Sequence, residues 1–541
     1  MEFLGTVDWL VVGLYFLVIA GISAWSMKKK KDSAQEYFLA NRNVGWFVIG
    51  ASILASNVGS EHVVGLAGTG ANSGLVMGHY ELHSWIALLL GWVFVPFYLR
   101  SKVFTMPEFL ERRYNERSRW FLSIVSLVGY VLTKVSVTVY AGAVVITSFL
   151  GVDFWTGALV LVIITGIYTV LGGMRAVVYT EALQAMVLIF GSLILTIIGL
   201  SHLGGWDAMI ASVPKERLNM FPPLSDPDFP WLGILFASPI VGLWYWCTDQ
   251  YIVQRTLTAR NEREARRGTI FAGYLKLFPF FIFLVPGLIA SALANAGQLE
   301  LTQTDQAFPA LVKNLLPIGL RGLVAGGLLA ALMSSLASVF NSCSTLFTMD
   351  IYRKLKPDTT DKNLVFVGRI ATSVVVVLGI LWIPVMRSIS GTLYQYLQSV
   401  QSYIAPPIAA VFLLGVFYKR INGKAALSVL ITGFVIGMLR IFLEINKDSL
   451  SGFLYSFADI NFLYFCIILF VVSIVLLIVI SVLTEKPSEE QLNGLTYATT
   501  VAEDRERSRA SWTTSDVVHS VIIVLFIIAV FIYFSPFGIA G

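Results

Sequence analysis

Long apolar stretches without a single charge recur along this chain, and they decide what it can fold into. Val11–Ala24, Val187–Leu200 and Phe465–Leu483 are examples, and with its flanks each reaches the ~20 residues that a helix needs to cross a bilayer. Hydrophobic residues make up 56% of the 541 residues and charged residues only 13%, against about 25% charged in soluble domains. We therefore predict an all-α membrane protein and exclude a water-soluble globule.

About fourteen transmembrane helices are predicted, and the charges of the loops between them provide a check. The spans fall at 7–27, 44–70, 78–100, 119–149, 154–172, 177–203, 230–254, 268–294, 318–350, 363–386, 390–417, 424–444, 455–484 and 513–536. Every second loop is basic, beginning with Lys28–Lys31, and Arg175 supplies the charge of the shortest one. Because lysine and arginine accumulate in cytoplasmic loops, both termini are predicted to lie outside.

Two spans are interrupted by polar and helix-breaking residues. The second span has six glycines and a polar centre of Ser56, Asn57, Ser60, Glu61 and His62. The seventh has Pro239 and Gly242 at its middle, followed by Trp244–Tyr245–Trp246. For one such span, close packing through small residues is an equally good explanation. Two of them, five spans apart, indicate an inverted repeat with solute and ion sites at the membrane midplane.

The interrupted spans also divide the chain into regions. We predict an extra helix and basic loop over 1–43, a first repeat over 44–203, an outer loop over 204–229, a second repeat over 230–418, and extra helices over 419–541 with a charged linker at 485–511. The core is thus five plus five helices.

Polar side chains inside the spans are candidates for a solute site, because an ionisable group at the centre of a membrane helix costs roughly 2.5–3.5 kcal/mol. A structural ion pair would account for Lys134. Glu81 and Lys276 fall at the depth of a midplane cavity, where with Gln398, Gln401 and His62 they offer donors and acceptors to hydroxyl groups. Tyr245 and Trp246 could stack on the apolar face of a sugar.

Ser334 and Ser335 are adjacent in the ninth span, with Ala331 one turn earlier. Serines often only hydrogen-bond back to their own helix. Beside an interrupted helix, however, two hydroxyls and free carbonyls form a neutral all-oxygen cage that suits a monovalent cation. A proton-coupled site would need a carboxylate there.

Several long blocks of the chain resemble the sodium/glucose cotransporter branch of the solute:sodium symporter family. They include EYFLANRNVGW, TMPEFLERRY, WYWCTDQYIVQR, GYLKLFP and MSSLASVFNSCSTLFTMDIY. The resemblance implies a LeuT-type fold of about fourteen helices with a ten-helix inverted-repeat core. It implies a sodium site at the carbonyls of Ala55, Val58 and Ala331 and the hydroxyls of Ser334 and Ser335. It implies solute contacts at Asn57, His62, Glu81, Ser84, Tyr245, Trp246, Lys276, Gln398 and Gln401.

Departures from the family pattern limit what the resemblance implies. Members with a second sodium site have Asp and Thr where this chain has Glu181 and Ala337, although Ser338 is kept. One sodium per solute is therefore expected, with Glu181 and Ser338 as a weaker second cation site. Gly242 and Gln401 also differ from many sugar carriers. Glucose or galactose is favoured as the solute, with myo-inositol or another polyol as the alternative.

Other functional classes find less support in the residues. A channel would need a filter-like motif, a receptor a soluble output domain, and an enzyme a nucleotide loop, metal cluster or nucleophile–base pair. None of these is evident in the sequence. A transporter-like solute sensor stays open as an alternative. The expected partners are a neutral sugar or polyol, sodium as the only metal, and the lipid bilayer. No cofactor, nucleic acid or obligate protein partner is expected. The short loops suggest a bacterial inner membrane.

Overall fold

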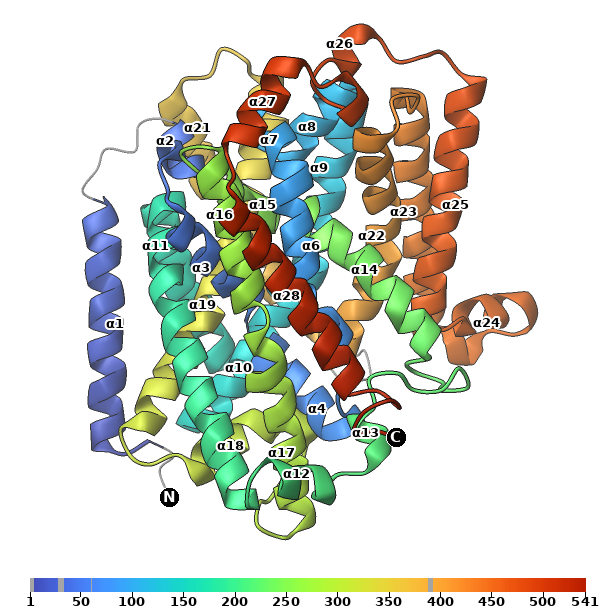
Figure 1. The fold of residues 1–541 in the computed structure, drawn as a ribbon. Coiled ribbons are helices and arrows are strands. Elements are labelled where there is room, and N and C mark those ends of the chain that lie inside the picture. Colours follow the sequence, from blue (N-terminus) through green and yellow to red (C-terminus); the bar gives the residue numbers. More distant parts are fainter. Residues whose placement is uncertain (1–3, 28–33, 60, 388–392) are drawn as a thin grey trace.

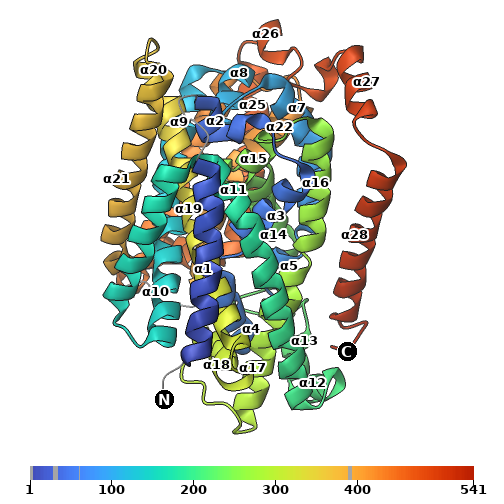
Figure 2. The same cartoon turned by 90° about the vertical axis from the view of Figure 1, so that its left-hand side faces the viewer.

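The computed structural model describes residues 4–27, 34–59, 61–387 and 393–541. Within them the chain is helical, apart from loops and one isolated bridge between Val44 and Ala259. Figures 1 and 2 show a bundle of long, steeply inclined helices. The start of α1 and the C-terminal residue lie at one end, and α8, α26 and α27 lie at the other. The predicted all-α membrane fold is confirmed, while the basic cluster Lys28–Lys31 and Ser60 lie outside the described residues.

Eleven helices in the described part are long and apolar enough to cross a membrane, or thirteen if each of two bent pairs is one span. A shorter apolar helix, Phe154–Ile167, occupies the remaining predicted position. The continuous spans are built from α1 (Thr6–Met27), α5 (Gly78–Glu81) with α6 (Ser84–Leu89) and α7 (Val95–Ser101), α9 (Glu116–Tyr130) with α10 (Ser136–Leu150), α11 (Phe154–Leu203), α16 (Glu262–Leu275) with α17 (Val285–Asn295), α19 (Leu320–Leu346), α21 (Asp361–Arg387), α22 (Leu393–Phe417), α23 (Gly423–Ile445), α25 (Phe462–Leu483) and α28 (Thr514–Tyr533).

The two bent pairs are the second and seventh predicted spans. In the first, α3 (Trp46–Asn57) meets η2 (Glu61–Leu66) and α4 (Ala67–Ser73) at 58°. In the second, α14 (Trp231–Cys247) meets α15 (Gln250–Leu257) at 44°. The breaks therefore lie five spans apart, as the sequence predicts.

The position of the second break differs from the prediction. Pro239 and Gly242 lie inside α14, which continues through both of them. The chain bends at Thr248 and Asp249 instead, where the Asp249 carboxylate accepts the backbone N–H of Tyr251 at 3.2 Å and caps α15. A proline is tolerated within a membrane helix when neighbouring groups satisfy the freed carbonyl, whereas a capping aspartate begins a new helix.

Three further boundaries differ. The predicted spans 154–172 and 177–203 fall in one helical element, α11, and the side chain of Arg175 lies outside the described residues. The span predicted at 455–484 starts only at Phe462, after a separate short helix. The 485–511 linker is partly helical.

The short helices are α2 (Ala34–Leu39), α8 (Met106–Arg113), α12 (Trp206–Ser212), α13 (Lys215–Leu218), α18 (Ala307–Leu315), α20 (Arg353–Leu355), α24 (Gly452–Asp459), α26 (Glu489–Leu492) and α27 (Ala502–Ala510).

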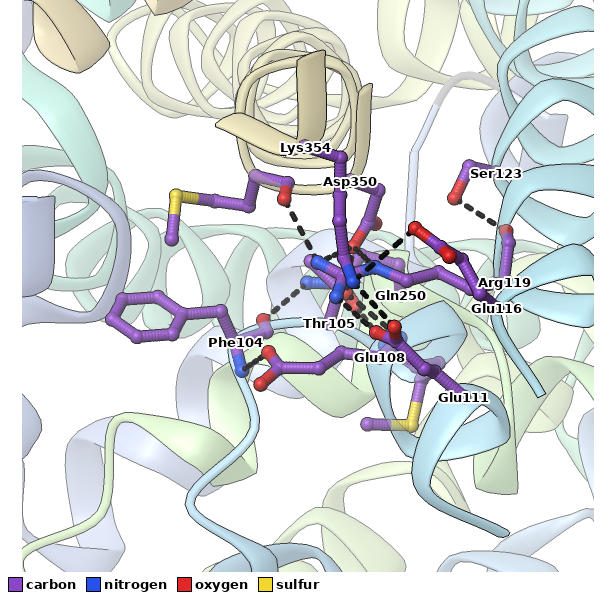
Figure 3. Close-up of polar contacts among 12 residues, drawn as sticks. Phe104, Thr105, Glu108, Glu111, Glu116, Arg119, Ser123, Gln250, Asp350 and Lys354 are labelled. Carbon is purple, nitrogen blue, oxygen red and sulfur yellow. Dashed lines mark hydrogen bonds and ion pairs between the residues drawn. The ribbon is translucent and has the colours of Figure 1, made fainter. Parts of the chain in front are cut away.

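A polar network joins the helices at the end of the bundle that carries α8 (Figure 3). Arg119 of α9 donates to the Asp350 carboxylate at 2.8 Å and pairs with Glu111 of α8, which also binds Lys354. Partial burial raises the pKa of Glu111, but hydrogen bonds from Lys354 and Arg119 bring it below its usual range. Gln250, the first residue of α15, accepts the backbone N–H of Met106 at 2.9 Å. The second half of a bent pair is thus tied to the start of α8.

Candidate functional site

A cavity lies beside both helix breaks, and most of the predicted solute residues line it. Its volume is about 50 Å³, room for one or two water molecules at ~30 Å³ each, so a hexose would enter only if the surrounding helices moved apart. Its polar and aromatic lining comprises Asn57, Glu61, His62, Tyr80, Glu81, His83, Lys134, Thr138, Tyr245, Trp246, Tyr251, Lys276, Tyr394, Gln398 and Gln401. Of the nine predicted solute contacts, Ser84 alone is not in this wall. It is fully buried on α6 instead.

A buried ion pair forms one wall of the cavity. Lys276, at the end of α16, binds the Glu81 carboxylate of α5 at 2.6 Å, and both side chains are at most 2% exposed. The Tyr394 hydroxyl donates to the other Glu81 oxygen at 2.6 Å, and His62 Nε2 lies 3.3 Å from that carboxylate. Glu81 therefore holds together residues from three spans and from the first helix break.

Several polar atoms of the lining residues are buried without a hydrogen-bond partner among the described residues. They are Asn57 Oδ1, His83 Nε2, Glu61 Oε2 and Gln398 Oε1. Buried groups of this kind normally find a partner, because leaving one unpaired costs about 1–3 kcal/mol. Their mixture of donors and acceptors fits a neutral ligand with several hydroxyl groups, each of which can both donate and accept.

Aromatic rings form the side of the cavity nearest the second break. The Asn57 amide donates to the Tyr245 hydroxyl at 3.2 Å, which links α3 to α14. Lys134 Nζ lies 4.5 Å from the Tyr245 ring centroid and 3.8 Å from that of Tyr251, and it forms an ion pair with Asp249. The structural ion pair expected for Lys134 is therefore present, although the residue also borders the cavity.

The predicted sodium residues come together where α19 passes the end of α3. The Ser334 hydroxyl lies 3.5 Å from the Ala55 carbonyl oxygen. Ser335 Oγ is buried and has no hydrogen-bond partner among the described residues. A Cβ at Gly59 would lie only 2.3 Å from this oxygen, so glycine is needed for the break to approach α19. The unpaired Ser335 hydroxyl and the extended backbone at Val58, whose N–H bonds to the Leu54 carbonyl, fit an oxygen-coordinated cation.

Glu181 and Ser338, the residues of the weaker second cation site, are close together, but the Glu181 carboxylate already has hydrogen-bond and ion-pair partners in the protein. Glu181 accepts hydrogen bonds from the hydroxyls of Ser52, Ser56 and Ser338. Arg255 Nη2 forms an ion pair with it at 3.1 Å, and both of these side chains are fully buried. The guanidinium thus supplies a positive charge where a second cation would bind.

Seven of the polar and aromatic lining residues were not among the predicted contacts: Glu61, Tyr80, His83, Lys134, Thr138, Tyr251 and Tyr394. Tyr394 lies four residues before Gln398 and seven before Gln401 on α22, so helical spacing puts all three on one face. Lys134 was treated as structural only. His83 lies two residues after Glu81, within the HYELHS segment, and no sequence pattern separates it from the neighbouring histidines.

A helical bundle with two broken spans and a polar cavity at the breaks defines the class of secondary transporters with a midplane site. The model of the Sodium:solute symporter family matches residues 37–433. The chain belongs to the sodium:solute symporter family.

Relatives of the chain are similar over most of their length. The chain is 40% identical over 532 residues to sodium/glucose cotransporter 1 of Ovis aries, covering 90% of this chain and 80% of that protein. It is also 40% identical over 531 residues to sodium/myo-inositol cotransporter 2 of Bos taurus, covering 91% and 79%.

Solved structures confirm the fold. A sodium-coupled sialic acid symporter in a substrate-bound, outward-open state superposes with a TM-score of 0.75 at 21% identity, covering 89% of this chain and 98% of that one. The transporter Mhp1 of the nucleobase-cation-symport-1 family gives a TM-score of 0.54 at 13% identity, covering 86% and 98%. The expected LeuT-type fold is thus confirmed.

Proposed function

We propose that the chain is a sodium-coupled importer of a sugar or polyol that works by alternating access. The observation that carries the proposal is the cavity between the two helix breaks. It combines the buried Glu81–Lys276 pair with polar atoms on Asn57 and Gln398 that have no hydrogen-bond partner among the described residues. A neutral polyhydroxylated solute would satisfy these atoms without adding a charge to the membrane interior.

Sodium would bind between α3 and α19 at Ala55, Val58, Ala331, Ser334 and Ser335. Binding there would order the break that carries Asn57 and the polar residues after it. The two halves of the fold, 44–203 and 230–418, would then rock around the occupied site. The basic loops would face the cytoplasm and both termini the outside; the bacterial inner membrane stays a prediction.

The test is uptake of labelled solute into proteoliposomes with an inward sodium gradient. Uptake that requires sodium, and that glucose, galactose or myo-inositol competes away, is expected. Uptake that continues unchanged when potassium replaces sodium would refute the coupling. Specific binding of the solute without any uptake would favour the solute sensor. Comparing the competition constants of the hexoses and myo-inositol separates the two solute classes, both of which occur among the named relatives.

Replacing Ser335 by alanine is expected to weaken sodium dependence. The variant removes a buried hydroxyl that has no protein partner among the described residues, so the fold should be retained while the half-saturating sodium concentration rises about 10- to 100-fold. Ser344→Ala is the matched control, because this serine lies on the same helix and its hydroxyl donates to the Gly368 carbonyl at 2.7 Å. Ser335→Ala with the sodium dependence of the wild type would contradict the assignment.

Replacing Gln398 by alanine is expected to weaken solute binding about tenfold, the effect of losing one or two hydrogen bonds. Sodium dependence should change little, because Gln398 belongs to the cavity and not to the α3–α19 contact. The control is Gln395→Ala, one turn earlier on α22 and outside the cavity lining. The apparent affinity for solute is read from uptake at saturating sodium, and an equal loss in both variants would remove Gln398 from the site.

A further inference from the structure

A second polar cavity lies far from the solute site, where α7 and α16 meet the segment from α27 to the start of α28. Its volume is about 480 Å³. Among the described residues its lining contains four arginines, Arg100, Arg266, Arg505 and Arg509, and no acidic side chain. Figure 1 shows α7, α16 and α27 close together at the end of the bundle that carries α8. We propose that this cavity binds the phosphate headgroup of an anionic phospholipid.

The charges around the cavity leave an excess of positive charge. Arg266 is paired with Glu262 at 2.7 Å. In the described part of the chain, Arg100, Arg505 and Arg509 have no acidic partner within ion-pair distance, and Arg505 only donates its Nε to the Thr500 carbonyl at 3.1 Å. One anion in the cavity would lie among three guanidinium groups that have no carboxylate of the described residues within ion-pair distance.

Two of the arginine N–H groups also lack acceptors. The Nε atoms of Arg100 and Arg266 are buried and have no hydrogen-bond partner among the described residues. A buried charged donor without an acceptor is costly. A phosphate group has several anionic oxygens and matches the planar fork of a guanidinium better than any other common anionic group except a carboxylate.

The depth of the cavity favours a lipid over a free anion. Trp92 belongs to the apolar span Gly78–Ser101, and Arg100 lies near the end of that span, about 12 Å further along at ~1.5 Å per residue. The Trp92 ring packs on Trp512 at 5.4 Å and under the Arg266 guanidinium at 4.9 Å. Tryptophan marks the membrane–water boundary, where arginine clusters recognise anionic headgroups. An amphiphile would fill both the charged rim and the apolar wall.

A headgroup in this position would also link separate parts of the chain. Arg100 ends a span of the first predicted repeat, whereas Arg509 belongs to the C-terminal region. The lipid would therefore help to hold α28 against α16. These two helices already contact each other through the Tyr274 hydroxyl of α16 and the His519 ring of α28, 2.9 Å apart.

The test is binding of fluorescent phosphatidylglycerol to the purified full-length protein in neutral detergent, with fluorescent phosphatidylcholine as the comparison lipid. Arg100→Gln/Arg509→Gln removes two lining charges at positions that are not fully buried, and phosphatidylglycerol should bind about thirtyfold more weakly. Arg507→Gln is the matched control. It lies on the same helix, is 72% exposed, pairs with Glu503, and does not line the cavity.

The expected result is loss of phosphatidylglycerol binding in the double variant alone, with its thermal unfolding midpoint unchanged in lipid-free detergent. Equal binding of the two lipids, unchanged binding in the double variant, or an equal loss in Arg507→Gln would overturn the proposal. Displacement of the lipid by millimolar inorganic phosphate would overturn the lipid as occupant and assign the cavity to a free anion. Neither result depends on transport, so failure here leaves the proposed function standing.

Discussion

Lys276→Ala is expected to reduce sodium-driven uptake by at least a hundredfold and to lower the stability of the protein in detergent. The mutation leaves the Glu81 carboxylate, which is 1% exposed, without its cation. Removing one partner of a buried pair costs about 3–5 kcal/mol, because the remaining charge is uncompensated. Uptake should fall for a second reason if Lys276 donates a hydrogen bond to the solute, as proposed. Uptake and the unfolding midpoint are measured on the same preparation.

A double variant separates these two effects. Glu81→Gln/Lys276→Met removes both charges and should recover most of the lost stability, because an uncharged pair of similar volume is tolerated in a buried site. Uptake should stay low if the ion pair binds the solute. Recovery of uptake in the double variant would show that the pair is structural only. Lys313→Ala, which removes an exposed lysine on α18, controls for the change in net charge.

The number of spans and the interrupted pair of helices could be read from the sequence because they depend on local properties. Apolar runs and loop charges locate helices whatever they pack against. The exact site of the second break was predicted wrongly, because the prediction relied on Pro239 and Gly242. Pro239 was the more familiar helix breaker, yet Asp249, which caps α15, determined where the chain bends.

Part of the solute site could likewise be predicted from the sequence, and part of it depends on tertiary packing. Asn57, Glu81 and Lys276 could be proposed from burial cost and family resemblance, and Tyr394 could have been added from its helical spacing to Gln398. The partner of Lys134, Asp249, could not be named, because 115 residues separate the two and only tertiary packing brings the segment between α9 and α10 against the turn between α14 and α15. Ser84 is buried on α6 and does not line the cavity, so its contact with the solute stays a prediction.

The Glu181–Arg255 pair leads to the second large expected effect. One sodium ion per solute is expected in the wild type, because the guanidinium already supplies the positive charge beside Glu181. At ~100 mV and an assumed tenfold sodium gradient, one ion provides about 3.7 kcal/mol, enough for a few-hundredfold accumulation. Two ions would square that ratio, so simultaneous measurement of sodium and solute flux distinguishes the two stoichiometries clearly.

Arg255→Met should expose the latent cation site. Without the guanidinium, the Glu181 carboxylate stays fully buried among the hydroxyls of Ser52, Ser56 and Ser338, and stability should fall by about 3–5 kcal/mol in potassium buffer. These oxygens resemble a sodium cage, so sodium should restore part of the loss as a ligand that binds only the folded state. The thermal unfolding midpoint is measured in sodium and in potassium for the wild type and the variant.

The control for this effect is Glu181→Gln/Arg255→Met, which removes both charges together. In this double variant, the difference between the unfolding midpoints in sodium and in potassium should be no larger than in the wild type, where only the α3–α19 site binds sodium. If Arg255→Met shows no greater sodium dependence than this double variant, the serine hydroxyls and Glu181 do not form a cation site even when it is vacated. A buried carboxylate that arginine neutralises has no reason to bind a further cation. Measurement of two sodium ions per solute in the wild type would therefore contradict the idea that the Arg255 guanidinium takes the place of the second ion.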